Sequence, residues 1–188
     1  MIYDPAKGTV HDYYLSECQR LICPGSRALK TDLDNEVNQG YASIPGGIIG
    51  NVEARWTAIE YDPKVVQKAR DRKVNAYLIQ GDIRKLQVAP SWFDVVVDLS
   101  TLDHIPTEDI PLALTGYWRS LSVGGLLILF VWCGESVSFP EWQPTQQYAH
   151  PLAVMRDQLR ALFRIEEQQE TIHNGERVLV EFICRKAL

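Results

Sequence analysis

The stretch Trp56–Pro63, WTAIEYDP, contains the pattern that decides the fold. Its first five residues are rich in apolar and β-branched types and predict a short strand, Trp56–Glu60. Asp62 and Pro63 follow at once. Asp is a favoured helix N-cap and Pro a favoured first helical residue, so the sequence predicts a helix over Lys64–Arg72. A strand followed by a helix is the repeating unit of a parallel α/β sheet.

The same alternation continues on both sides of this stretch. We expect a helix at Asp12–Leu21, a strand at Ala28–Leu33, a short helix around Ile48–Ala54, strands at Ala76–Gln80, Phe93–Leu99 and Leu126–Trp132, and helices at Thr107–Leu121 and Pro151–Phe163. Thr107 is expected to cap its helix, and Gly124-Gly125 to end it.

The end of the sequence predicts an antiparallel hairpin. Its two strands, Arg164–Ile172 and Arg177–Cys184, flank the strong turn dipeptide Asn174-Gly175. Five strand–helix alternations followed by this hairpin predict an α/β fold. We expect a Rossmann-like, seven-stranded, mostly parallel sheet with helices on both faces and a C-terminal antiparallel hairpin. A dinucleotide-binding dehydrogenase would normally end in parallel strands instead.

Length and composition indicate an ordinary globular protein. The 188 residues suit one domain, 1–188, and 46% are hydrophobic. Lys and Arg number 19 against 24 Asp and Glu, a net charge of -5, which argues against nucleic acid as the main partner. The longest apolar run, Leu126–Cys133, is too short for a membrane span, and no signal peptide is recognisable. We therefore expect a cytoplasmic protein with no membrane partner; its oligomeric state is not predicted.

The cysteines do not indicate a metal site. Cys18, Cys23, Cys133 and Cys184 form no CxxC pair and no Cys/His cluster at zinc spacing. We expect reduced thiols that act as small apolar side chains. Cys133 lies near the predicted site, but the sequence pairs it with no base.

Candidate site residues are those that follow the strands, because open parallel sheets bind ligands beyond the carboxyl ends of their strands. Glu60 ends the second strand, where an acid can accept both hydroxyls of a ribose; the alternative is an exposed acid at a strand end. Asp82 follows the third strand and can accept from an adenine amino group, while Ile83 offers a backbone N–H and an apolar face. The alternative is that Asp82 merely opens a turn.

Polar side chains also gather after the fourth strand, whose core is wholly apolar. The segment Asp98–Pro106, DLSTLDHIP, carries Asp98, Ser100, Asp103 and His104. We expect this segment to lie where two reactants would meet.

Four motifs resemble, in order, those of the class I S-adenosylmethionine-dependent methyltransferases: Glu60 with Asp62-Pro63, Gly81-Asp82-Ile83, Phe93-Asp94-Val95-Val96-Val97, and Gly124-Gly125-Leu126. The match covers roughly Ala28–Trp132. The resemblance implies S-adenosylmethionine as cofactor, with Glu60 and the adjacent Tyr61 at the ribose and Asp82 with Ile83 at the adenine. It places Asp98 and Ser100 near the methionine moiety.

The first motif departs from the family pattern. The family has an acid followed by alternating glycines after the first strand, where the backbone approaches the cofactor. Here Lys30 stands where the acid is expected, and no glycine follows until Gly40. Asp32 or Glu36 is then expected to receive the cofactor's amino group, and Lys30 to pair with an acid or with the cofactor carboxylate. The alternative is a pocket that no longer binds a cofactor.

Catalysis of methyl transfer requires little beyond alignment, because the sulfonium is already an activated donor. An oxygen or nitrogen acceptor also needs a proton removed, and His104 and Asp103 are the candidate bases. His104 could equally cap a helix or bind the backbone. No matching pair of acids follows the fifth strand, so no metal is expected.

We therefore expect methyl transfer to a small-molecule acceptor. The loop Cys133–His150 carries Phe139, Trp142 and Tyr148 and lies on the acceptor side of the predicted fold. The alternative is a non-catalytic S-adenosylmethionine-binding or regulatory protein. A nucleotide-dependent oxidoreductase would need Gly-x-Gly-x-x-Gly after the first strand, and the sequence has none there.

Overall fold

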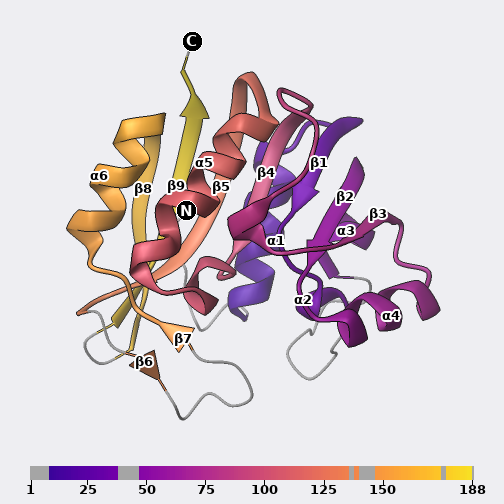
Figure 1. Cartoon of the computed structure of the whole chain (residues 1–188), viewed down its shortest axis with the longest axis horizontal. Helices are drawn as coiled ribbons and strands as arrows, with labels where there is room; N and C mark the ends of the chain where they lie inside the picture. The colour runs from indigo at the N-terminus through magenta and orange to yellow at the C-terminus, as the bar shows by residue number, and fades with distance from the viewer. Residues whose placement is uncertain (1–8, 38–46, 136–137, 140–146, 175–176, 188) are drawn as a thin grey trace.

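The computed structural model describes residues 9–37, 47–135, 138–139, 147–174 and 177–187 (Figure 1). A seven-stranded sheet has the order β3-β2-β1-β4-β5-β9-β8, and its first five members are parallel. β9 is antiparallel to both neighbours, which confirms the predicted fold class. The strands are β1 Ser26–Lys30, β2 Ala54–Glu60, β3 Ala76–Gln80, β4 Phe93–Leu99, β5 Leu121–Cys133, β8 Phe163–Asn174 and β9 Arg177–Lys186. A short ribbon of β6 (Ser138–Phe139) and β7 (Gln147–Tyr148) was not predicted.

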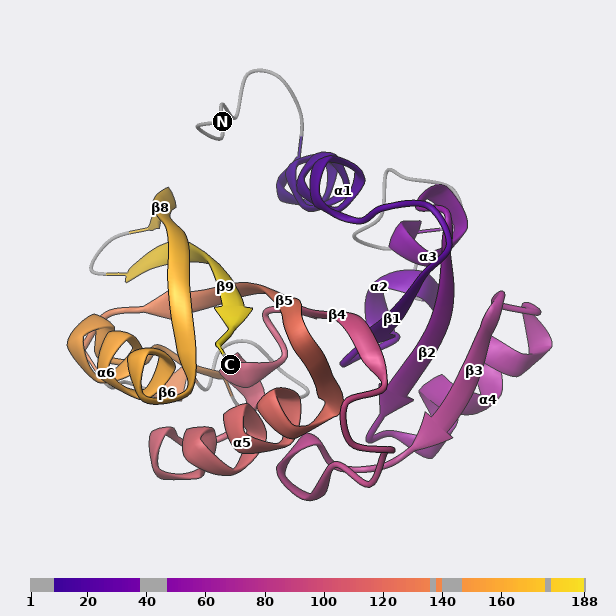
Figure 2. The same ribbon diagram turned by 90° about the horizontal axis from the view of Figure 1, so that it is seen from above.

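Helices cover both faces of the sheet (Figure 2). They are α1 Val10–Leu21, α2 Asp34–Val37, α3 Gly47–Asn51, α4 Pro63–Asp71, α5 Ile110–Ser120 and α6 Leu152–Leu162, with short 3-10 turns η1 Ile83–Lys85, η2 Leu102–His104 and η3 Thr107–Asp109. Residues of α1, α3 and α4 belong to one buried apolar cluster, and residues of α5 and α6 to the other. Alternate residues of the central strands supply the two clusters, as expected for strands buried on both faces.

The first residues of α4 and α1 are set by N-capping hydrogen bonds. Asp62 accepts a hydrogen bond from the Lys64 N–H, with Pro63 at the first helical position, as predicted. α1 begins two residues before its predicted start, because Thr9 and Asp12 form a reciprocal capping box.

β1 ends three residues earlier than predicted, at Lys30 rather than Leu33. The Leu33 N–H donates to the Glu60 carboxylate at 2.9 Å instead of to a neighbouring strand, so the ladder stops before it. The short helix predicted around Ile48–Ala54 is α3, and Ala54 already belongs to β2.

The predicted cap of α5 is wrong. Thr107 begins η3, and α5 starts only at Ile110, after Asp109, with no capping bond from a side chain. The Thr107 hydroxyl lies 2.9 Å from Nδ1 of His150 instead. Thr107 therefore bonds to His150, which is distant in the sequence, rather than to the backbone at the start of α5.

The predicted role of Gly124-Gly125 is also wrong. α5 ends at Ser120, and β5 begins at the next residue, Leu121, so both glycines lie inside the strand. Gly124 has φ +74, and the register between β4 and β5 shifts just before Leu126. The glycines allow a bulge in β5 rather than ending a helix.

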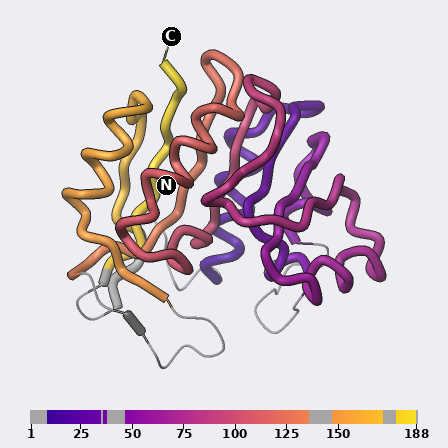
Figure 3. Tube along the Cα trace, viewed as in Figure 1, coloured from indigo at the N-terminus to yellow at the C-terminus, as the bar shows by residue number. Residues whose placement is uncertain are grey.

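The described part of the chain contains no helix that is both long and apolar enough to cross a membrane. All four cysteines are free thiols, and all but Cys23 are buried. The Asn174-Gly175 turn lies partly outside the described residues, although β8 ends at Asn174 and β9 begins at Arg177, as the hairpin prediction requires. The chain trace in Figure 3 shows β3 and β8 near opposite sides of the molecule.

Candidate functional site

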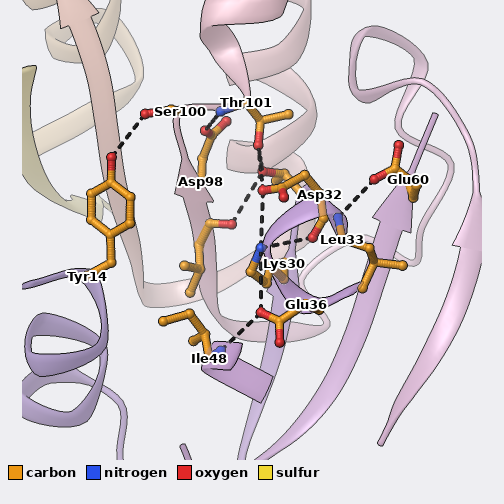
Figure 4. Close-up of polar contacts among 12 residues, drawn as sticks. Tyr14, Lys30, Asp32, Leu33, Glu36, Ile48, Glu60, Asp98, Ser100 and Thr101 are labelled. Atoms are coloured by element: carbon orange, nitrogen blue, oxygen red, sulfur yellow. Dashed lines mark hydrogen bonds and ion pairs between the residues drawn. The ribbon is translucent and has the colours of Figure 1, made fainter. Parts of the chain in front are cut away.

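The carboxyl ends of β1, β2 and β4 meet at one edge of the sheet. Between β1 and β4 the strand order reverses, which is where open α/β sheets bind ligands. Figure 4 shows residues from all three strand ends gathered here, joined by hydrogen bonds and ion pairs. This group contains most of the predicted site residues: Lys30, Asp32, Glu36, Glu60, Asp98 and Ser100.

Lys30 is the last residue of β1 and is completely buried. Its Nζ lies 3.1 Å from Asp32 Oδ2 and 3.8 Å from Glu36 Oε1, and donates to the Asp32 carbonyl at 2.9 Å. Burial alone would lower the pKa of Lys30, but the two carboxylates outweigh it and the pKa is raised. Lys30 is therefore a charged, fixed group that pairs with acids of its own chain.

Glu36 holds the start of α3. Its carboxylate accepts from the Ile48 N–H at 3.1 Å and the Ile49 N–H at 3.3 Å, and its burial raises its pKa. Gly47 passes so close that a Cβ there would lie 2.0 Å from Glu36 Oε2, and its φ is +58. Only glycine fits this close approach. Glu36 is thus committed to the internal structure of this segment.

Asp32 is the acid of this group that reaches the surface. Its side chain is 17% exposed, whereas those of Lys30 and Glu36 are 0% and 1% exposed. Thr101, from the loop after β4, donates to Asp32 Oδ2 at 3.1 Å, and its hydroxyl is also 2.7 Å from that of Thr31. The Asp32 carboxylate is therefore held between two strand ends.

Glu60 is a fixed acceptor at the end of β2. Its Oε2 accepts from the Leu33 N–H at 2.9 Å and its Oε1 from the Asp62 N–H at 2.8 Å. Burial raises its pKa. Because Glu60 is 9% exposed, it is not the exposed acid of the alternative interpretation, while the adjacent Tyr61 is 71% exposed. Each carboxylate oxygen keeps a further lone pair for a ligand.

Asp82 opens η1, as the alternative interpretation of this residue had it. Its carboxylate accepts from the Arg84 backbone N–H at 2.9 Å and forms an ion pair with the Arg84 guanidinium at 2.7 Å. The guanidinium holds the pKa of Asp82 below its usual range. Arg84 also pairs with Asp109 at 2.9 Å. Ile83 is buried. The adenine contacts of Asp82 and Ile83 stay predictions.

Asp98 stabilises the loop after β4 from inside. It is completely buried, accepts from the Tyr117 hydroxyl at 2.7 Å and the Thr101 N–H at 2.7 Å, and burial raises its pKa to about 6. These partners lie within the fold, so a direct contact between Asp98 and a cofactor stays a prediction.

Ser100 has a strained backbone at the same loop. Its φ of +68 is uncommon for a residue other than glycine, and such strain is often found at functional sites. The Ser100 N–H donates to the Phe130 carbonyl at 2.9 Å, and its Oγ lies 3.1 Å from the Tyr14 hydroxyl (Figure 4). Tyr13 and Tyr14 are both buried against Phe130. α1 thus closes over this strand end.

The two candidate bases occupy different surroundings. Asp103 is completely buried, and its Oδ1 accepts from the Trp132 N–H at 2.9 Å, which ties η2 to β5. His104, the next residue, is exposed. Cys133 is buried, which raises the pKa of its thiol to about 12 and excludes a reactive thiolate near neutral pH.

His150 is a residue of this region that the sequence analysis did not single out. Its ring Nε2 lies 3.1 Å from the Leu102 carbonyl, and its ring Nδ1 lies 2.9 Å from the Thr107 hydroxyl. Its backbone N–H donates to the Trp132 carbonyl. Burial lowers its pKa, so the neutral ring donates from Nε2 and accepts at Nδ1. No local pattern predicts this role, because all three partners are far away in the sequence.

Comparison with known proteins gives one family match. Residues 42–129 match the model of a methyltransferase domain. No curated protein matches the chain.

Solved structures share the fold at low sequence identity. An N1-methyltransferase of 1,6-didemethyltoxoflavin from Burkholderia thailandensis, solved with that molecule and S-adenosylhomocysteine, has a TM-score of 0.72 at 13% identity, covering 97% of this chain and 80% of that one. The N-methyltransferase NodS from Bradyrhizobium japonicum WM9, in complex with S-adenosylhomocysteine, has a TM-score of 0.66 at 15% identity, covering 93% and 86%. The cyclase SpnF has a TM-score of 0.70 at 15% identity, covering 95% and 80%.

The family match covers residues 42–129 and ends within β5, and the shared fold extends over nearly the whole chain. Together they confirm the resemblance to the class I S-adenosylmethionine-dependent methyltransferase superfamily that the sequence motifs predicted.

Proposed function

We propose that this protein transfers a methyl group from S-adenosylmethionine to a small-molecule acceptor. The observation that carries the proposal is the Glu60 carboxylate, fixed by two backbone N–H groups at the carboxyl end of β2. It lies beside the switch point of a sheet whose order is that of the methyltransferase fold. Structural neighbours with this fold were solved with S-adenosylhomocysteine, the product of the cofactor.

The nucleoside half of the cofactor fits the residues present. Vicinal ribose hydroxyls are donors, and a preoriented carboxylate such as Glu60 accepts from both without needing to reorganise. Tyr61 is exposed next to it and offers an aromatic surface to a planar base. Asp82 follows β3 at the adjacent position in the sheet.

The amino-acid half would use Asp32 in place of the family's strand-end acid. Lys30 fills that strand-end position but is completely buried and cannot reach a ligand. It holds the Asp32 carboxylate instead, with Thr101 on the other side. Asp32 is the partly exposed acid of the triad and is the acceptor that we assign to the cofactor ammonium.

Catalysis then consists of alignment and removal of one proton. S-adenosylmethionine, when bound, supplies a methyl group that is already activated by its sulfonium. The protein has to orient the acceptor and exclude water. Of the two candidate bases, His104 is exposed and Asp103 is buried, so we assign proton removal to His104, with Asp103 as its structural neighbour on η2.

The test is calorimetric titration of the wild type and three variants with S-adenosylmethionine. Glu60→Ala and Asp32→Ala should each weaken binding by about tenfold or more, because each removes a charged hydrogen-bond acceptor. Glu53→Ala is the matched control, since Glu53 is an exposed acid just before the opposite end of the same strand. No binding by the folded wild type would overturn the proposal.

A second candidate is a protein that binds S-adenosylmethionine without turnover. It is favoured by the buried Lys30 at the position of the family's acid and by the burial of Asp103. The discriminating measurement is S-adenosylhomocysteine formation in an acceptor screen, with His104→Ala beside the wild type. Cofactor binding with no turnover on any acceptor would favour this second function.

A further inference from the structure

A second group of polar and aromatic side chains lies at the amino ends of the same strands, opposite the candidate site. The amino ends of β1 to β4 and the turn before β3 surround an open cleft of about 780 Å³. This volume is within the range of small-molecule sites. The side chains that carry the chemistry are Arg27, Arg55, Lys73, Tyr77, Trp92 and Asp94.

The cleft is open because none of the helices in the described part of the chain covers this part of the sheet. Alternate residues of a strand share a face, so Arg55 and Thr57 lie on the same side as Ile59, and Tyr77 on the same side as Ile79. At the carboxyl half of the strands, Ile59 and Ile79 pack into the apolar cluster that contains Ile83 and Leu86, from the connection after β3. That connection is a single 3-10 turn followed by irregular chain, and it leaves the amino half open.

The lining of the cleft is basic although the protein is acidic. Three cations face one anion, Asp94, in a chain of net charge -5. Arg27 is held by Asp94 at 2.7 Å. Among the described residues, Arg55 donates only from its Nε, to the Gly25 carbonyl at 3.0 Å, and its charge helps to lower the pKa of Asp94. Lys73 forms no ion pair within the described part of the chain. Arg55 and Lys73 thus present unused donors to the cleft.

Two exposed aromatic rings accompany these cations. Tyr77 is 73% exposed and Trp92 is 52% exposed, although large aromatic side chains are usually buried. The Arg27 guanidinium lies 4.9 Å from the Trp92 ring centroid and is fixed by its ion pair with Asp94. Trp92 is therefore held as a platform on which a planar group could stack.

The backbone is strained at the same place. Among the described residues, three other than glycine have positive φ: Ser100 at the candidate cofactor site, Lys73 at +54 and Ser91 at +52. Lys73 lines the cleft, and Ser91 immediately precedes Trp92. Such backbone conformations persist where the surrounding structure enforces them. Here they occur at a cation that lines the cleft and beside an aromatic ring that flanks it.

We propose that this cleft at the amino ends of the strands binds a small anion of the nucleoside-phosphate class. Its planar base would stack on Trp92 or Tyr77, and its phosphate would bind Arg55 and Lys73. Exposed rings would provide stacking surface, and paired cations would provide charge-assisted bonds to phosphate oxygens. The site is separate from Glu60 and Asp32, which lie at the other ends of the same strands. The proposal therefore does not depend on the proposed methyl transfer.

The test is titration of the full chain with adenosine diphosphate, guanosine diphosphate and inorganic pyrophosphate, followed by calorimetry. The double variant Arg55→Ala/Lys73→Ala should weaken nucleotide binding at least about tenfold, and Trp92→Ala should weaken nucleotide but not pyrophosphate binding. Lys64→Ala/Arg160→Ala is the matched control, since it removes two exposed cations elsewhere. Thermal unfolding of each variant checks that it is folded.

Glu60→Ala separates the two sites. It should weaken S-adenosylmethionine binding and leave nucleoside diphosphate binding unchanged, whereas the double cleft variant should do the reverse. Nucleotide binding that is lost in Glu60→Ala and kept in the double cleft variant would show binding at the cofactor edge and overturn the proposal. Absence of binding of either nucleoside diphosphate by the folded wild type would overturn it equally.

Discussion

Replacing Asp98 by Asn tests the electrostatics of the loop after β4. Asp98 is completely buried, and its carboxylate accepts from Tyr117 and Thr101. Burial raises its pKa from 3.8 to about 6, because ionisation in the interior costs more than these hydrogen bonds recover. Asn keeps the shape and an acceptor oxygen but cannot ionise.

The sign and size of the effect follow from linkage. Between pH 3.8 and about 6 the folded protein keeps the Asp98 proton that the unfolded chain has lost, so this group's contribution to stability falls as pH rises through that window. The difference between these two pKa values corresponds to a free energy of about 3 kcal/mol. Asp98→Asn should therefore match the wild type near pH 4 and exceed its unfolding free energy by up to about 3 kcal/mol at pH 8.

The assay is urea unfolding of both proteins from pH 4 to pH 8. Asp94→Asn is the control on the same strand: Arg27 lowers the pKa of Asp94, so this variant should lose stability at every pH above 3.8. An unfolding free energy of Asp98→Asn that stays below that of the wild type by the same amount at pH 4 and pH 8 would refute the reasoning.

Two further substitutions test the segment after β1. Lys30→Met should lower the unfolding free energy by about 3–5 kcal/mol at pH 7, because it leaves the Asp32 and Glu36 carboxylates without their buried cation, and the loss should shrink near pH 4 as Glu36, whose pKa is raised by burial, becomes protonated. Urea unfolding measures it, and stability equal to the wild type at pH 7 would contradict it. Gly47→Ala should cost at least about 1–3 kcal/mol, because its φ is +58 and its Cβ would meet Glu36. Gly50→Ala in the same helix has open space and should be harmless in thermal unfolding; equal losses for both would show that the contact with Glu36 is unimportant.

Local patterns predicted the sheet well and its connections less well. β3 and β4 have the predicted ends, and α4 has its predicted cap, because alternation and capping are encoded within a few residues. The errors at Thr107 and Gly124-Gly125 have the opposite origin. Thr107 bonds to His150, 43 residues away, and the glycines serve the register between two strands. A local pattern contains no information about such partners.

The candidate site was predicted in the same uneven way. The positions of Glu60 and Asp98 follow from the rule that ligands bind at strand ends, and the structure does gather them there. What each side chain contacts could not be predicted: Asp98 faces Tyr117 on α5, and Asp103 faces Trp132 on β5. Strand periodicity predicts that a residue is buried but not which group satisfies its hydrogen bonds.

The burial of Lys30 accounts for how the altered first motif could still accommodate S-adenosylmethionine under the proposed function. A strand-end lysine would place a positive charge beside a cationic sulfonium ligand if it were exposed, and this would oppose binding. Burial against two acids removes that repulsion: the Lys30, Asp32 and Glu36 triad has a net charge of -1, and its partly exposed member is the Asp32 carboxylate. Under the proposed function, the lysine at the family's strand-end position would hold Asp32, two residues later, and Asp32 would take the place of the family's acid. Lys30→Met should accordingly weaken S-adenosylmethionine binding through the loss of Asp32 positioning, although Lys30 itself touches no ligand.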